Sequence, residues 1–196
     1  MPPFNNGWVI FFSLIPFFIT LNSISAKPLF KTRFYHSLLH GFLFGFIFMG
    51  FSNLWMFELI HYSSTIEIIC LYIVFTLMQS IFYCLFACFC CLLRLPLWLF
   101  PFSWVIAEWL RGSGLFASTH YAIGYSQSLN GLILQYASLG GLYLVSFLCV
   151  LINIGLIYWY RLARISLNQR KYFLSMAIFP SIFIILMLFN LFLAQK

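Results

Sequence analysis

An acidic and a basic side chain stand close together in an otherwise apolar stretch of this sequence. Glu108 and Arg111 are three residues apart, a spacing that places both on one face of a helix. A carboxylate and a guanidinium in or beside a bilayer are costly unless they are paired or hydrated. Two interpretations are open. The pair is a helix-end ion pair that fixes the following turn, or Glu108 positions Arg111 to attract an anionic lipid phosphate or backbone carbonyls.

Other residue types that do chemistry in proteins do not complete a site here. His36 and His40 have the spacing of a metal-binding pair, but no Cys, Asp or Glu nearby completes a coordination shell. Cys84, Cys88 and Cys91 share one helical face within an apolar run, where burial disfavours the thiolate that a nucleophile needs. The chain has no aspartate, no serine hydrolase motif and no glycine-rich phosphate loop. The sequence therefore predicts no catalytic residue, no metal and no cofactor.

The composition defines the class of protein that positions these residues. Of the 196 residues, 64% are hydrophobic, 22% are aromatic and 7% are charged, and the mean hydropathy is +1.02. Several apolar runs approach the roughly 20 residues that a helix needs to cross a bilayer, and the alternating pattern of a membrane β-barrel is absent. We predict an all-α, polytopic transmembrane helix bundle, a single domain over residues 1–196 with no soluble domain.

Turn-forming residues divide the apolar sequence into about six predicted spans. Asn22, Ser23 and Pro28 close the first span, and Pro96 separates the third from the fourth. Segment 112–138 has no acidic or basic residue and suits a re-entrant or interfacial element. The first span lacks a preceding basic region and a following cleavage site, so we expect it to be retained. The predicted spans are approximately 8–23, 37–57, 66–92, 97–110, 139–160 and 172–193.

The distribution of basic residues predicts the orientation in the membrane. The net charge of +7 comes from residues between apolar spans, which indicates topology and not a nucleic-acid partner. Eight Lys and Arg lie in connections on one side, which we predict to be cytoplasmic, and both termini are then extracytoplasmic. The loop that contains Glu58 and Glu67 faces outward as well. The eight are Lys27, Lys31, Arg33, Arg94, Arg161, Arg164, Arg170 and Lys171, against Arg111 and Lys196 on the other side.

Several short motifs, in order along the chain, resemble the membrane part of bacterial apolipoprotein N-acyltransferases. They are Gly-Phe-Leu-Phe-Gly at 41–45 in a run that ends near Trp55, Glu-Trp-Leu-Arg-Gly at 108–112, Gly-Tyr-Ser-Gln at 124–127 and Gly-Gly-Leu-Tyr at 140–143. That family transfers an acyl chain from a phospholipid to the terminal diacylglyceryl cysteine of a lipoprotein. The resemblance implies phospholipid and lipoprotein substrates, lipoprotein biosynthesis, and an active face outside the bacterial inner membrane.

The resemblance also implies which residues contact substrate. Glu108, Arg111, Tyr125 and Gln127 are expected to organise the outward loop that faces a nitrilase-like partner, and Trp55 is expected to line the lipid side. The family carries its Glu-Lys-Cys catalytic set in a nitrilase-like domain, and none of that set maps onto these residues. We therefore expect the chain to be inactive alone and to need a nitrilase-like catalytic domain; a separately encoded nitrilase-like subunit is one possible source of it.

Two other classes of function remain open from the sequence. The chain could be a noncatalytic membrane assembly subunit or a relic, which the lack of a neighbouring nitrilase-like gene would favour. It could also be a lipid or small-solute transporter, which predicts flux in proteoliposomes.

Overall fold

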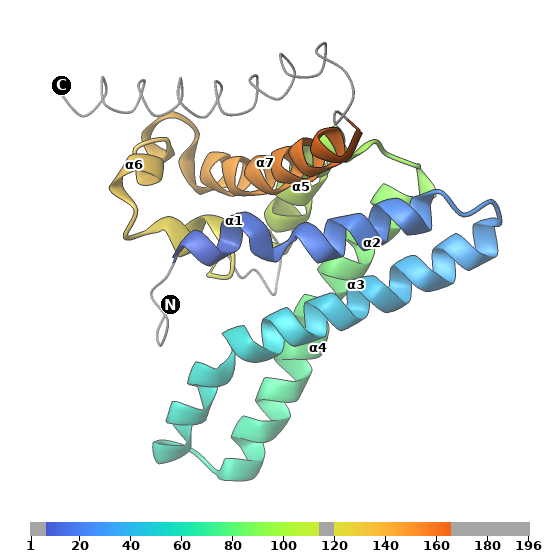
Figure 1. Cartoon of the computed structure of the whole chain (residues 1–196). Coiled ribbons are helices and arrows are strands. Elements are labelled where there is room, and N and C mark those ends of the chain that lie inside the picture. Colours follow the sequence, from blue (N-terminus) through green and yellow to red (C-terminus); the bar gives the residue numbers. More distant parts are fainter. Residues whose placement is uncertain (1–6, 114–119, 166–196) are drawn as a thin grey trace. The chain divides into compact units, whose positions relative to one another are not determined.

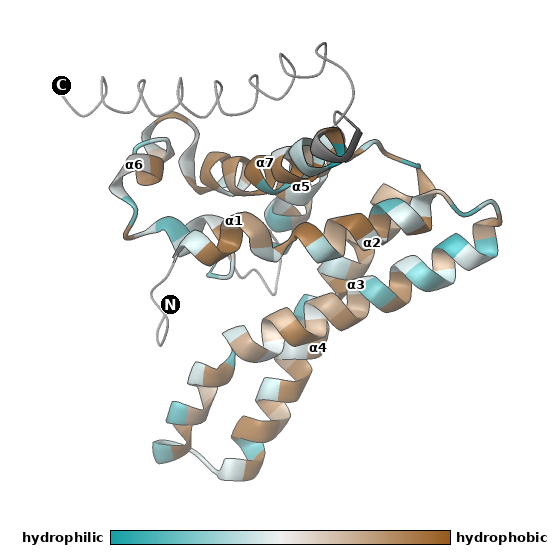
Figure 2. Ribbon diagram, in the orientation of Figure 1, coloured by the Kyte–Doolittle hydropathy of each residue, from teal (hydrophilic) through white to brown (hydrophobic). Residues whose placement is uncertain are grey.

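The computed structural model describes residues 7–113 and 120–165, and every regular element in these ranges is a helix (Figure 1). Hydrophobic residues cover much of the long helices (Figure 2). Within the described ranges, four helical stretches are long and apolar enough to cross a membrane. The predicted all-α class is confirmed, and the chain is a multi-pass membrane protein. The four stretches are Gly7–Ser25, Phe30–His61, Thr65–Leu92 and Ala137–Leu162.

The predicted number of six spans is not confirmed. Region 97–110 is helical, as the short 3-10 helix η3 (Leu97–Leu99) followed by α5 (Phe100–Arg111). The 12 residues of α5 extend only about 18 Å at 1.5 Å per residue, which is less than a hydrocarbon core of about 30 Å. The predicted span 172–193 lies outside the described residues. The single domain over 1–196 stays a prediction.

The chain divides into two compact units, and we describe each by itself. Of the described residues, 19–113 and 120–121 form the α3–α5 unit, and 7–18 and 122–165 form the α7 unit. Helix α2 (Ile15–Ser25) passes from one unit to the other. The α3–α5 unit contains α3 (Phe30–Ser52), the 3-10 helix η2 (Leu54–His61), α4 (Thr65–Leu92), η3 and α5. The α7 unit contains η1 (Gly7–Val9), α1 (Ile10–Ser13), η4 (Ile123–Gln127), α6 (Gly131–Leu134) and α7 (Ala137–Ile165).

Two glycines bring α3 and α4 into direct backbone contact. A Cβ on Gly41 would lie 2.7 Å from the carbonyl oxygen of Tyr83 and 2.8 Å from the Cβ of Ala87. A Cβ on Gly45 would lie 2.9 Å from the Tyr83 ring. Small residues four apart on a helix permit this close packing between membrane helices. The two helices therefore form a tight antiparallel pair, with Tyr83 held at their interface.

The end of α4 turns the chain back so that α5 packs on α4. The Leu95 N–H donates to the Cys90 carbonyl at 2.9 Å, and the Arg94 N–H donates to the Cys91 carbonyl at 3.3 Å. This is the Schellman arrangement of helix ends, which requires a left-handed residue and usually has glycine there. Arg94 takes that position with φ of 51°, and Pro96 then prevents the helix from continuing.

A buried asparagine supports the break between α1 and α2 in the α7 unit. The Leu14 N–H donates to Oδ1 of Asn153 at 3.2 Å. Nδ2 of Asn153 donates to the carbonyls of Ile10 at 2.7 Å and Cys149 at 2.9 Å. Asn153 thereby gives the interrupted helix hydrogen-bond partners inside an apolar span, where unsatisfied backbone groups are costly.

Candidate functional site

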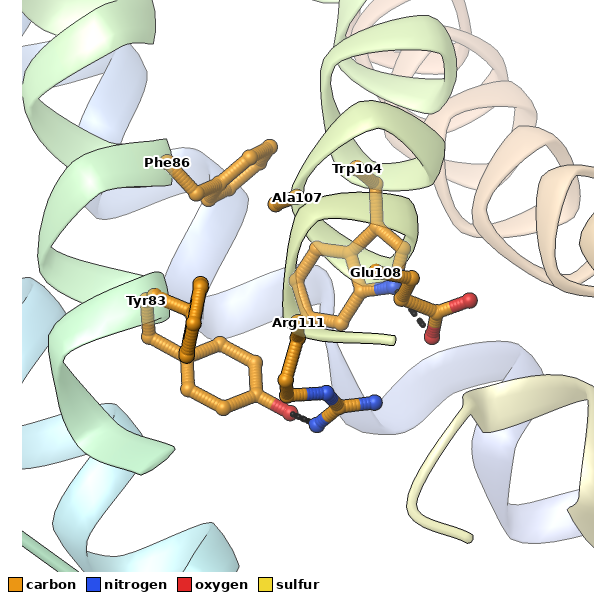
Figure 3. A pocket seen from close by; sticks show the side chains of 7 residues that line it. Tyr83, Phe86, Trp104, Ala107, Glu108 and Arg111 are labelled. Atoms are coloured by element: carbon orange, nitrogen blue, oxygen red, sulfur yellow. Dashed lines mark hydrogen bonds between the residues drawn. The ribbon is translucent and has the colours of Figure 1, made fainter. Parts of the chain in front are cut away.

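Glu108 and Arg111, near the end of α5, line one small cavity in the α3–α5 unit (Figure 3). The cavity has a volume of about 10 Å³, which is room for about one water molecule. The structure therefore brings the two charged residues to one place, as their spacing predicted. The lining residues all come from α4 and α5: Phe82, Tyr83, Phe86, Trp104, Ala107, Glu108 and Arg111.

Arg111 is almost completely buried and uses only one side of its guanidinium. The side chain is 1% exposed, and Nη1 donates to the Tyr83 hydroxyl at 2.9 Å (Figure 3). Nε and Nη2 have no hydrogen-bond partner in the part of the chain that the structure describes. These two nitrogens form one edge of the planar guanidinium, the edge that binds both oxygens of a carboxylate or phosphate. Tyr83 thus holds Arg111 with this edge buried and unpaired among the described residues.

Glu108 is held by a different aromatic residue. Its side chain is 5% exposed, and Oε1 accepts a hydrogen bond from Nε1 of Trp104 at 2.9 Å. Trp104 lies four residues before Glu108, so both side chains are on one face of α5. Each of the two charged residues therefore has its own aromatic hydrogen-bond partner.

Aromatic rings from three helices surround Tyr83 and Trp104. The centroid of the Trp104 ring lies 5.6 Å from that of Tyr83 and 5.1 Å from that of Phe86. Phe44 on α3 lies 5.4 Å from Tyr83 and 6.2 Å from Trp104. These edge-on and tilted contacts are the favourable geometries for aromatic pairs. They fix the two partners of the charged residues and lower the local dielectric constant, which strengthens electrostatic interactions there.

The contact between Arg111 and Tyr83 lies near the middle of α4. With 28 residues, α4 is about 42 Å long, and Tyr83 lies about 7 Å from its midpoint at 1.5 Å per residue. The contact therefore lies in the half of α4 that ends at Leu92.

Trp55 occupies a separate place in the α3–α5 unit and does not line the cavity. It is 52% exposed on η2, and its Nε1 donates to the Tyr121 hydroxyl at 3.0 Å. Burial raises the pKa of Tyr121, and the hydrogen bond from Trp55 opposes that shift. Tyr121 was not among the predicted site residues, and it anchors Trp55 with half of the indole still exposed.

Tyr125 and Gln127 lie on η4 in the α7 unit. Nε2 of Gln127 donates to the Gly7 carbonyl at 2.7 Å, and Oε1 accepts from Nδ2 of Asn130 at 3.0 Å. The amide of Gln127 thus joins η4 to the start of the first helix. Tyr125 is 43% exposed. The five predicted residues are therefore divided between the units, with Trp55, Glu108 and Arg111 in one and Tyr125 and Gln127 in the other.

Sequence reasoning missed the two residues that hold the charged pair. Tyr83 and Trp104 lie in apolar helices, where aromatic residues usually serve packing. The usable indications were the spacing of four residues between Trp104 and Glu108, and the need of a buried tyrosine or tryptophan for a hydrogen-bond partner.

Comparison with known proteins identifies the family. The apolipoprotein N-acyltransferase N-terminal domain family matches residues 1–155. The chain belongs to this family. The apolipoprotein N-acyltransferase of Chromobacterium violaceum is 40% identical over 71 residues, which are 36% of this chain and 13% of that protein. No solved structure matches the chain.

The family match confirms the resemblance that the motifs indicated. The matched residues include all five predicted site residues and the cavity beside Arg111. The 71 aligned residues cover only 13% of the length of the Chromobacterium violaceum protein. The fold and site described here therefore belong to the membrane part of the family.

Proposed function

We propose that the chain is the membrane module of phospholipid-to-lipoprotein N-acyl transfer and that Arg111 binds the phosphate of the phospholipid. Membership of the N-acyltransferase family and the four apolar helices support the membrane module. The observation that carries the lipid assignment is the buried edge of Arg111, where Nε and Nη2 have no described partner.

The surroundings of Arg111 favour an anionic ligand. A buried guanidinium with unsatisfied donors is energetically costly. A ligand that accepts hydrogen bonds from Nε and Nη2 removes this cost, which favours its binding. A phosphodiester presents two non-bridging oxygens, which match the two donors of this edge. The cavity of about 10 Å³ has room for one of these two oxygens, so the second oxygen reaches the guanidinium only when the lining side chains move apart. Tyr83 keeps the guanidinium in the required orientation.

The other predicted residues have supporting parts in this proposal. Glu108 holds Trp104 through its indole nitrogen and so fixes one wall of the cavity. Trp55, with half of its surface exposed, contacts the acyl chains on the lipid side. Tyr125 contacts the lipoprotein or the catalytic partner, and Gln127 holds η4 in place for that contact.

Acyl transfer itself takes place on a nitrilase-like domain, supplied as a separately encoded subunit or by a continuation of the chain. Cys90, Cys91 and Cys149 are fully buried in apolar helices, where a thiolate nucleophile is disfavoured. Because none of the family's Glu-Lys-Cys set maps onto these 196 residues, we expect them to be inactive by themselves. The module lies in the bacterial inner membrane, with the basic connection between the first two apolar helical stretches in the cytoplasm.

Phospholipid retention by purified variants tests the assignment of Arg111. We expect Arg111→Gln to retain at least about tenfold less phospholipid per chain, because hydrogen bonds to a charged group contribute about 1.5 to 3 kcal/mol each. Arg111→Lys should be intermediate, since it keeps the charge and loses the two-donor edge. Arg161→Gln changes the net charge equally, at a residue of the other unit, and should retain lipid normally. Equal retention by all variants, with unchanged partner association, contradicts the assignment.

Flux of lipid or solute in proteoliposomes that contain the chain alone would instead indicate a transporter. A chain that retains no phospholipid and associates only with other membrane proteins would indicate an assembly subunit.

A further inference from the structure

Arg33, near the start of α3, is a second buried cation, and the proposed acyl transfer does not use it. The side chain is 8% exposed, and its Nε and Nη1 are buried without a hydrogen-bond partner among the described residues. As at Arg111, a guanidinium in this condition is costly. A ligand that accepts from these donors would relieve the cost.

The register of the helix pair places Arg33 beside the last turn of α4. The buried face of α3 repeats every four residues, and Arg33 lies one turn before Ser37 on that face. The hydroxyl of Ser37 lies 3.4 Å from the thiol of Cys88 on α4. Cys91, nearly one turn further along α4, is within electrostatic range of Arg33. The guanidinium therefore lies between α3 and the C-terminal end of α4.

This end of the α3–α4 pair is basic and has no acidic residue. Because the helices are antiparallel (Figure 1), the start of α3 and the end of α4 lie together. Glu58 and Glu67 are at the other end of the pair, and hydrophilic residues colour the start of α3 teal in Figure 2. We call this set the basic end, which consists of Lys27, Lys31, Arg33 and Arg94.

The surroundings of the basic end are apolar and exposed. Leu29 and Phe30 precede Arg33, and Leu93 and Trp98 flank Arg94; all four side chains are exposed. Tryptophan and long basic side chains next to apolar surface are typical of the boundary between hydrocarbon and headgroups. A ligand at this place is therefore presented by the lipid bilayer.

We infer that the basic end binds the headgroup of an anionic phospholipid, with Arg33 as its central donor. Basic pockets between membrane helices bind such headgroups. A headgroup phosphate at this end of the helix pair supplies acceptors to Nε and Nη1 of Arg33. Several cations without a carboxylate select a lipid with net negative charge over a zwitterionic one. This lipid stabilises the fold and is distinct from the acyl donor at Arg111.

The test compares the chain in nanodiscs of phosphatidylcholine with nanodiscs that also contain phosphatidylglycerol. We expect phosphatidylglycerol to raise the Tm and to be enriched around the chain. Arg33→Gln should lower the apparent affinity of the chain for phosphatidylglycerol about fivefold, which is the equivalent of about 1 kcal/mol for one basic residue at an anionic membrane surface. In phosphatidylcholine alone, Arg33→Gln should not lower the Tm, because it removes a buried charge that has no acceptor. Arg161→Gln, the charge-matched control, should respond to phosphatidylglycerol like the unmodified chain.

Three results would overturn the inference. First, the unmodified chain could have the same Tm in nanodiscs with and without phosphatidylglycerol. This comparison needs no variant, so it is decisive even when Arg33→Gln fails to fold. Arg33→Gln could lower the Tm equally in both lipids, as a purely structural residue would. Inorganic phosphate added to phosphatidylcholine nanodiscs could reproduce the whole effect, which would identify a site for free phosphate.

Discussion

Replacement of Tyr83 by phenylalanine tests how Arg111 is held in the membrane. The change removes the hydroxyl that accepts from Nη1 of Arg111 at 2.9 Å and keeps the ring that packs against Phe44 and Trp104. A hydrogen bond to a charged group contributes about 1.5 to 3 kcal/mol in soluble proteins, whereas bonds between membrane helices average about 0.6 and reach about 1.7 kcal/mol. Because this bond is buried and charged, we expect a loss near the upper membrane value, about 1.5 kcal/mol.

Tyr72 supplies a matched control on the same helix. Its hydroxyl donates to the Gly50 carbonyl at 3.0 Å, so Tyr72→Phe also removes one hydroxyl, but from a bond without a charged partner. We expect this control to lose about 0.6 kcal/mol, the membrane average.

Reversible unfolding in mixed micelles, titrated with a denaturing detergent, measures both losses on one scale. Tyr83→Phe should also retain severalfold less phospholipid, because the free edge of Arg111 is no longer oriented, whereas Tyr72→Phe should retain it normally. Tyr83→Phe that is as stable as Tyr72→Phe and retains as much lipid would refute the role given to Tyr83.

Two further predictions concern helix packing and alkaline stability. Gly41→Ala should destabilise the chain by about 1 to 3 kcal/mol through overpacking, because its Cβ would lie 2.7 Å from a backbone oxygen of α4. The Cβ of Gly50→Ala would lie 3.3 Å from the movable Tyr72 hydroxyl, so this control should lose clearly less stability in the same detergent titration. Equal losses for the two variants would contradict the packing described. Burial raises the pKa of Tyr121, so the stability that its neutral hydroxyl contributes is complete below about pH 10 and is lost as the pH rises through the raised pKa. Tyr121→Phe should therefore flatten the fall of Tm above about pH 10. An unchanged slope of Tm against pH would contradict this assignment.

Composition and residue spacing predicted the class of the fold because both act locally. The apolar content required membrane helices, and Gly41 and Gly45 indicated the close approach that α3 and α4 make. The length of α5 was harder to interpret. Region 97–110 is largely apolar, yet its 14 residues suit a packed or re-entrant helix as well as a crossing one. After the turn at Arg94, α5 packs on α4.

The site was partly predictable for the same reason. Glu108 and Arg111 stand out in any apolar sequence, because charge there needs a partner. Their partners Tyr83 and Trp104 do not stand out, since aromatic side chains fit an apolar helix without further explanation. Gln127 was predicted from a motif, and its hydrogen bond to Gly7, 120 residues away in the sequence, is a tertiary contact that no local pattern reveals.

The central claim is that this chain is a membrane module that works with a nitrilase-like catalytic domain. Affinity purification of the tagged chain from its native membranes in mild detergent, followed by mass spectrometry, tests it most directly. The account predicts a nitrilase-like domain in stoichiometric amount, as a second polypeptide or joined to the tagged chain. Repeated recovery of the intact chain without any such domain would contradict it.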